Sequence, residues 1–175
     1  MNQRVVICDV DGVLLPWDQW RMDGLRLLLQ KTGAKVVLSS TWRQSKKLMG
    51  QLRKAFEENG VDPAAIVDST PSLPNALRSE EIKTWIRSHP EVLRVVIIND
   101  VQINDPELLP FFVKTEPLVG LDEKAAQKAA VILLGDEHAV KNDHDLITRT
   151  SGYKKGVQHE SEDQARTYRP PSILP

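Results

Sequence analysis

Cysteine is almost absent from this chain of 175 residues, in which Cys8 is the only one. An intramolecular disulfide framework is therefore excluded. Because Cys8 ends the apolar run at residues 5–8, we expect a buried thiol that is unreactive. The first residues lead straight into this run without an apolar signal core. A reducing compartment suits such a chain, and the cytoplasm is the expected location.

A strong net charge and a long hydrophobic run are also missing. The 23 basic and 24 acidic residues give a formal net charge of −1. No overall field therefore attracts nucleic acid or an anionic membrane, and any anionic substrate must be bound by a local group of charges. No stretch approaches the roughly 18 apolar residues of a membrane span. We therefore expect no membrane partner.

The hydrophobic residues that are present, 41% of the chain, form a repeating pattern of strands and helices. Short apolar runs rich in β-branched residues predict buried strands at residues 5–8, 36–38, 95–98 and 111–114. One-sided apolar repeats predict helices that end near Gly33, Asn59-Gly60, His89-Pro90 and Gly135. Strands that alternate with helices predict an α/β fold, a three-layer Rossmann-like parallel sheet flanked by helices.

The character of the sequence changes after Gly135. Residues 136–175 are polar, lack a sustained period and contain three of the four histidines. We therefore predict a folded domain at 1–135 and a disordered polar tail at 136–175. A metal-binding or RNA-binding arm is the alternative for the tail. Acidic residues interleaved among its basic ones favour the disordered tail.

Two acidic residues, Asp9 and Asp11, directly follow the first predicted strand. They are expected at its carboxyl end, where open α/β sheets bind ligands, and Gly12 permits the chain to turn there. An Asx-rich turn that merely closes the strand is the alternative. A calcium loop is disfavoured because no further acid follows at the loop spacing.

Polar residues also follow the second and third strands. Ser39 and Ser40 precede a predicted helix, where hydroxyls and free N–H groups can bind phosphate or simply cap the helix. Asn99 and Asp100 end the third strand. Between the second and third strands, Arg78 lies at the start of a predicted helix. The helix dipole disfavours a cation at this position unless an anion binds there or water solvates the cation.

These four segments, in this order, resemble the four motifs of the haloacid-dehalogenase-like (HAD) hydrolase superfamily. Three short segments are more specific than these general motifs. They are Leu-Ser-Ser-Thr-Trp-Arg at 38–43, Ser-Thr-Pro at 69–71 and Arg-Ser-Glu-Glu-Ile at 78–82. These segments resemble the small capless branch found in Swiss Army Knife RNA repair proteins. The phosphatase half of the phage polynucleotide kinase/phosphatase is similar at a greater distance. The resemblance covers roughly residues 4 to 134.

The resemblance implies a catalytic pair and a metal ion. Asp9 would be the nucleophile that forms an aspartyl-phosphate, and Asp11 would be the general acid and then the base. Mg²⁺ would be held by a carboxylate oxygen of Asp9, the backbone carbonyl of Asp11 and the acid of the fourth motif. Many relatives have two acids in that motif, whereas this chain has Asn99 before Asp100. Either Asn99 supplies an amide oxygen or Asp100 is the ligand.

The resemblance also implies a phosphate-binding group. Ser39 would bind the transferring phosphoryl group, with Ser40 as the alternative. Arg78 stands where the family usually has a lysine, and Lys83 is the second candidate for that position.

The expected function is a Mg²⁺-dependent phosphomonoester hydrolase. The connections at 12–38 and 40–77 are too short for a large cap domain, which needs about 50 residues of its own. An open site suits a nucleic-acid end, a nucleotide or a phosphoprotein. Trp17 and Trp20 could form a flap on which a base stacks, although packing over the first helix is the simpler expectation.

Two rival functions stay open. Asn99 and the missing lysine motivate one of them, a catalytically weakened binding or regulatory module, and a phosphoprotein phosphatase is the other.

Overall fold

The computed structural model describes residues 3–135, so the predicted tail at 136–175 lies outside the described residues. The strands are β1 (Gln3–Cys8), β2 (Lys35–Leu38), β3 (Ile66–Ser69), β4 (Val92–Asn99) and β5 (Phe112–Lys114). The helices are α1 (Gln19–Thr32), α2 (Lys46–Glu58), α3 (Arg78–Arg87) and α4 (Glu123–Leu134), with short 3₁₀ turns η1 (Thr41–Gln44), η2 (Pro63–Ala65) and η3 (Leu109–Phe111). No helix within residues 3–135 is long and apolar enough to cross a membrane.

The five strands form one parallel sheet in the order β3-β2-β1-β4-β5. The central strand β1 pairs with β2 on one side and β4 on the other, with Cys8 opposite both Leu38 and Ile98. The chain therefore proceeds outward from β1 to β3 and then returns to β4, so the order reverses between β1 and β4. Open α/β sheets bind ligands beside the carboxyl ends of the strands at such a switch point.

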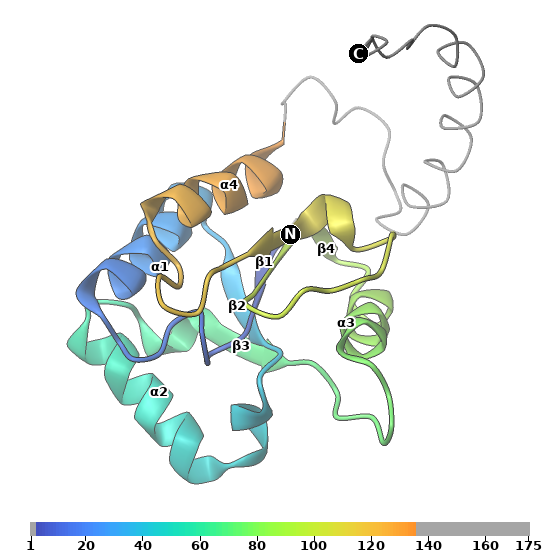
Figure 1. Ribbon diagram of the computed structural model, residues 1–175, viewed down its shortest axis with the longest axis horizontal. Coiled ribbons are helices and arrows are strands. Elements are labelled where there is room, and N and C mark those ends of the chain that lie inside the picture. The colour runs from blue at the N-terminus through green and yellow to red at the C-terminus, as the bar shows by residue number, and fades with distance from the viewer. Residues whose placement is uncertain (1–2, 136–175) are drawn as a thin grey trace, which may run out of the picture. The chain divides into compact units, whose positions relative to one another are not determined.

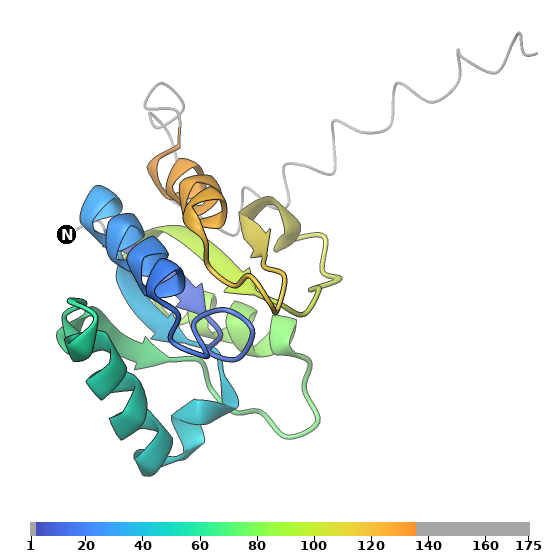
Figure 2. The ribbon, with the colours of Figure 1, turned by 60° about the vertical axis from the view of Figure 1, so that its left-hand side comes forward.

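Helices cover both faces of the sheet, which confirms the predicted three-layer Rossmann-like fold (Figure 1). Helices α1, α2 and α4 lie on one face and α3 on the other, as the turned view also shows (Figure 2). Val6 and Cys8 of β1 belong to the core under α1, α2 and α4. Val5 and Ile7, equally buried, point to the α3 face because side chains alternate along a strand. The same alternation directs Asp9 toward the α3 face.

The edge strand β3 was not among the strands predicted from the sequence. Val67 and Asp68 are exposed, so Ile66 is the one residue of this strand that is buried. A four-residue edge strand with one buried end has no clear apolar run, so its sequence does not stand out. The predicted strand at 111–114 begins one residue later, since Phe111 belongs to η3.

No large cap domain is inserted in the described chain. The connection between β2 and α3 is occupied by α2 and β3, both of which belong to the three-layer fold. Between β1 and α1 the loop is held by Arg21, a buried side chain that donates hydrogen bonds to the carbonyls of Leu15 and Pro117 and to Asp18. A guanidinium with these partners fixes the loop that follows the first motif.

Candidate active site

The residues that follow the strands form a row along the carboxyl edge of the sheet. The N–H of Asp9 donates to the carbonyl of Ile98 over 3.0 Å, and that of Ser39 donates to Cys8 over 2.9 Å. Thr70 continues the row beyond Ser39, because its N–H donates to the carbonyl of Leu38 over 2.9 Å. These bonds extend the parallel ladder by one residue beyond each strand. They bring together polar residues that lie up to 61 positions apart, from Asp9 to Thr70.

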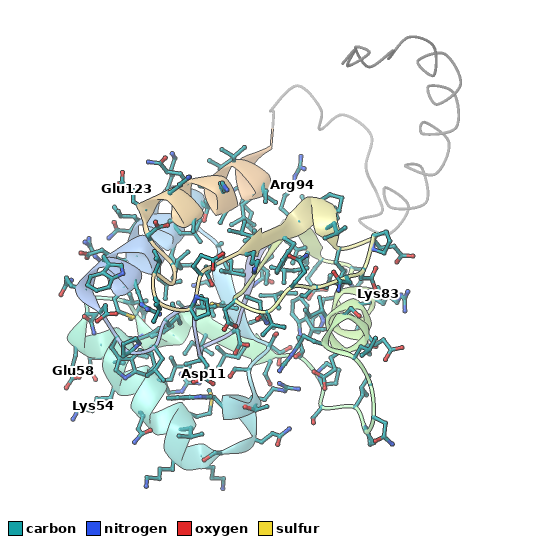
Figure 3. All side chains as sticks on the ribbon, viewed as in Figure 1. Asp11, Lys54, Glu58, Lys83, Arg94 and Glu123 are labelled. Carbon is teal, nitrogen blue, oxygen red and sulfur yellow. The ribbon has the colours of Figure 1, made fainter. Side chains whose placement is uncertain are left out.

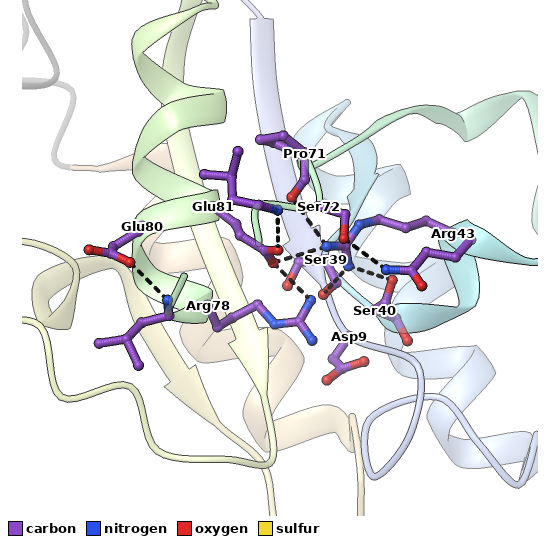
Figure 4. A network of polar contacts seen from close by, with 12 residues as sticks. Asp9, Ser39, Ser40, Arg43, Pro71, Ser72, Arg78, Glu80 and Glu81 are labelled. Atoms are coloured by element: carbon purple, nitrogen blue, oxygen red, sulfur yellow. Dashed lines mark hydrogen bonds and ion pairs between the residues drawn. The ribbon is translucent and has the colours of Figure 1, made fainter. Parts of the chain in front are cut away.

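Asp9 lies in a cavity of about 450 Å³ together with Arg78 and Asn99. The side chain is half-buried, and its Oδ1 accepts the N–H of Val10 over 2.7 Å. Figure 4 shows the Arg78 guanidinium between Glu81 and Asp9. One carboxylate oxygen of Asp9 is thus held by the backbone, and a cation extends toward the same cavity from the start of α3.

The thiol of Cys8 lies directly behind this carboxylate residue and is fully buried. Its Sγ donates to the carbonyl of Asp9 over 3.0 Å. Burial, and secondarily the negative charge of Asp9, raises the pKa of the Cys8 thiol well above its ordinary value. These observations agree with the predicted unreactive thiol, because only the thiolate is a good nucleophile.

Asp11 is exposed (Figure 3) and is not among the residues that line the Asp9 cavity. Its Oδ2 accepts the indole N–H of Trp42 over 3.1 Å. The Trp42 ring in turn packs edge-on against Trp17, with ring centroids 5.6 Å apart and planes at 88°. Trp17 is therefore engaged in packing, as the simpler expectation had it. Trp20, 51% exposed, donates its indole N–H to the carbonyl of Val119.

The fourth motif meets the first motif at Gly12. Gly12 has φ +66°, and a Cβ at this position would overlap the carboxylate of Asp100. Thr115 also contacts this turn, since its hydroxyl donates to the Gly12 carbonyl over 3.1 Å. Asn99 is buried, and its Oδ1 accepts the N–H of Val101 over 2.9 Å. Asp100 therefore lies against the first-motif loop, whereas the amide oxygen of Asn99 is used to close its own turn.

Carboxylates follow two neighbouring strands at this edge, and oxygen atoms of this type are the ligands that Mg²⁺ takes in proteins. Asp9 offers a carboxylate after β1, and Asp100 offers one beside Gly12, in the loop that also contains Asp11. Mg²⁺ binds through one or two carboxylates and keeps several of its waters, so a larger acidic cluster is not required. Within residues 3–135 no group of three or more His, Cys, Asp or Glu side chains is arranged to hold a metal ion.

Ser39 and Ser40 have different surroundings although both are buried. The Oγ of Ser40 accepts the N–H of Trp42 over 3.3 Å and caps η1. Ser39 lies beside Asp9 in the row described above and points to the same α3 face by strand alternation. The N-capping interpretation thus holds for Ser40, and Ser39 is the serine placed next to the predicted nucleophile.

The two predicted cations of the third motif are placed apart. Arg78 is the first residue of α3 and lines the cavity with Asp9. Lys83 extends from α3 on the side away from Asp11 (Figure 3) and forms an ion pair with Asp105, with Nζ 2.7 Å from Oδ2. It is not among the residues that line the Asp9 cavity. Its charge ties the loop after β4 to α3, and Arg78 is the cation of the two that lines the cavity with Asp9.

A buried ion pair beneath the site was missed by the sequence analysis. Arg43 Nη2 lies 2.9 Å from Oε2 of Glu81, and the two side chains are only 6% and 9% exposed. Figure 4 shows this pair joining the end of β2 to α3. Arg43 belongs to the segment at 38–43 that carries the family resemblance. Its pairing with Glu81, 38 residues away, has no local signal in the sequence.

The parallel sheet, with acidic residues at its switch point and a basic residue at the start of α3, defines a HAD-like hydrolase domain. The chain belongs to the family described as the HAD domain in Swiss Army Knife RNA repair proteins, whose family model matches residues 5–126. This membership supports a phosphatase-type hydrolase function in general. Neither the curated proteins nor the solved structures gave a match to this chain.

Proposed function

We propose that this domain is a Mg²⁺-dependent phosphomonoester hydrolase that acts on nucleic-acid ends or nucleotides through an aspartyl-phosphate on Asp9. The observation that carries the proposal is the shared cavity of Asp9 and Arg78 beside the β1/β4 switch point. A carboxylate nucleophile and a guanidinium that binds phosphate are the two groups that the first half of the reaction needs.

The proposed reaction has two steps. In the first, a carboxylate oxygen of Asp9 bonds to phosphorus, the bond from phosphorus to the leaving oxygen breaks, and Asp11 gives that oxygen a proton. In the second, water attacks phosphorus while Asp11 takes its proton, and the bond to Asp9 breaks to release phosphate. The Val10 N–H holds one oxygen of Asp9, which leaves the other free to attack.

Charge neutralisation explains the proposed metal requirement. A phosphomonoester carries about two negative charges at neutral pH. Asp9 and Asp100 add carboxylates, and like charges about 4 Å apart repel by about 4 kcal/mol at an effective dielectric of about 20. Bound Mg²⁺ would supply charge stabilisation of the phosphoryl oxygens. Together with Arg78 it would offset roughly three of these negative charges.

Ser39 and Arg78 are the proposed phosphoryl ligands from this chain. Ser39 follows β2 directly beside Asp9, and Arg78 extends from the start of α3 on the same face of the sheet. The planar guanidinium offers two parallel donors to phosphate oxygens, which the usual lysine does not. The arginine thus provides geometric selection for a tetrahedral anion.

The cavity beyond Arg78 supports a neutral leaving group. In the described part of the chain, the rest of its wall is uncharged and consists of Leu77, Ser79, Asn99, Val101, Gln102, Ile103 and Asn104. Leu77 and Val101 are 70% and 66% exposed, so apolar surface is open to a ligand. Amides that both donate and accept suit the edges of a nucleobase, and aliphatic side chains suit its faces. This lining favours a nucleoside over a highly charged phosphopeptide.

A substrate panel tests the proposal. Phosphate release would be measured with and without Mg²⁺ from 3′- and 5′-phosphorylated oligonucleotides, mononucleotides, a phosphopeptide and an aryl phosphate. We expect release only with Mg²⁺, and the highest kcat/KM with a substrate that has a nucleoside leaving group. A folded protein that releases phosphate from none of them contradicts the proposal and favours a binding module. Calorimetry with Mg²⁺ and beryllium fluoride would then show whether that module still binds a phosphate mimic.

A further inference from the structure

We infer that Glu81 and Arg43 are positioning residues that hold Arg78 in place for the phosphoryl group. This inference rests on the proposed function, because it assumes that Arg78 binds the substrate phosphate. Neither residue lines the Asp9 cavity, so they act through Arg78 and not on the substrate.

Arg43 joins the loops that surround the phosphoryl site. Its Nη1 donates to the carbonyls of Ser39 and Ser40 over 3.1 and 2.7 Å. Its Nη2 donates to the Pro71 carbonyl over 3.2 Å and to Oε2 of Glu81 over 2.9 Å. One buried guanidinium thus connects the loop after β2, the loop after β3 and the helix that begins with Arg78.

Glu81 is shared between two guanidiniums but binds them unequally. Its Oε1 accepts the N–H of Leu73 over 3.1 Å, and its Oε2 makes the 2.9 Å bond to Arg43. Nη1 of Arg78 lies 3.6 Å from the same Oε2, beyond the length of a hydrogen bond. The carboxylate therefore attracts Arg78 without accepting a full hydrogen bond from it.

Arg78 consequently has a donor to spare. Its Nη1 is buried and has no hydrogen-bond partner among residues 3–135, although the side chain as a whole is 29% exposed. A buried donor without a partner is costly, and an oxyanion in the adjacent cavity would supply the partner. Arg43 preserves this state, because it occupies the carboxylate that would otherwise close on Arg78.

A double-mutant cycle on Arg78 and Glu81 separates positioning from general stability. The four proteins are wild type, Glu81→Gln, Arg78→Ala and the double variant. For each, orthovanadate affinity is measured by calorimetry with Mg²⁺ present, and KM and kcat are determined separately. We expect Glu81→Gln to weaken vanadate binding about tenfold and to raise KM more than it lowers kcat. In the Arg78→Ala background the same change should cost less than about twofold, because the group that it positions is gone.

Two further variants keep the test decisive. Glu81→Asp retains the charge and favours folding, but its shorter side chain withdraws the carboxylate from Arg78, so the same loss of affinity is expected. Glu58→Gln removes an exposed glutamate that pairs with Lys54 on α2, and it should leave affinity unchanged. A folded Glu81→Asp with wild-type affinity, or additive losses in the cycle, would overturn the inference.

The outcomes also separate this inference from the proposed function. A wild type that binds vanadate but hydrolyses no substrate contradicts the phosphatase proposal, and the cycle on affinity still decides the role of Glu81. A wild type that hydrolyses substrate while both Glu81 variants match it contradicts only the positioning role. If the folded wild type has no affinity for vanadate, the inference is overturned together with the role of Arg78.

Discussion

The indole N–H of Trp42 donates a hydrogen bond to Oδ2 of Asp11 across 3.1 Å. This bond joins the loop after β2 to the loop after β1, and so it connects the phosphate-binding and catalytic segments of the proposed site. Trp17 supports the arrangement from the other side by edge-on packing against the Trp42 ring. The exposed Asp11 carboxylate is thereby held at one position by a side chain that is itself fixed.

Trp42→Phe is expected to lower kcat while leaving the free energy of unfolding nearly unchanged. The substitution removes the hydrogen-bond donor to Asp11 but retains an aromatic ring beside Trp17. Loss of about 1.4 kcal/mol of transition-state stabilisation would reduce kcat about tenfold. Trp20→Phe is the matched control, since it removes an indole N–H that is bonded to the Val119 carbonyl instead. Equal kcat values for the two variants in a phosphate-release assay would contradict a role for Trp42 in holding Asp11.

Gly12→Ala and Gly33→Ala form a second matched pair. Both glycines have positive φ, +66° and +65°, so each substitution should cost about 1–2 kcal/mol of stability from backbone strain. A Cβ at Gly12 would also displace the Asp100 carboxylate, whereas a Cβ at Gly33 meets nothing within 4 Å. We expect Mg²⁺ affinity measured by calorimetry to fall only in Gly12→Ala. Unchanged affinity in Gly12→Ala, or a fall no larger than that in Gly33→Ala, would contradict the role of Asp100 as a ligand.

The Asn99-Asp100 pair can be resolved by exchanging amide and carboxylate at each position. Asn99→Asp keeps the oxygen that accepts the Val101 N–H, so Mg²⁺ affinity should remain within about threefold of wild type. Asp100→Asn removes a carboxylate beside the first-motif loop and should weaken Mg²⁺ binding about tenfold or more. The reverse order of effects in a Mg²⁺ titration would assign the metal to Asn99.

Lys83→Met tests whether this lysine binds phosphate or only pairs with Asp105. The ion pair with Asp105 is partly exposed, so its loss should cost no more than about 1 kcal/mol, measured as a small fall in Tm. The KM for substrate should stay unchanged, because Lys83 does not line the Asp9 cavity. Arg78→Met, measured alongside, should raise KM strongly. A large rise in KM for Lys83→Met would assign Lys83 as a phosphate ligand.

The sequence was sufficient for the fold and for the residues at the strand ends. Buried strands have continuous β-branched runs, and the acids and hydroxyls that follow them can only lie at the carboxyl edge of a parallel sheet. That reasoning places Asp9, Ser39 and Asn99 at the ends of neighbouring strands, where the structure also has them. The short connections likewise predicted the absence of a large cap.

Long-range pairing and partial burial were beyond the sequence. Strand β3 is short and half-exposed at the sheet edge, so it produced no apolar run. Whether Lys83 faces the cavity or the opposite side of α3 depends on where Asp105 lies, which no local pattern encodes. The hydrogen bond from Trp42 to Asp11 joins residues 31 positions apart. The sequence signal for it was only that Trp42 lies in the segment at 38–43 that resembles the family.

Inorganic phosphate release by wild type beside Asp9→Asn tests the central claim most directly. Asparagine keeps the size of the side chain and an oxygen for the Val10 N–H, but it removes the carboxylate proposed as the nucleophile. We predict Mg²⁺-dependent turnover by wild type and a loss of at least about a thousandfold in Asp9→Asn at equal Tm. A variant that retains the wild-type rate would contradict the account, because phosphate would then be released without Asp9.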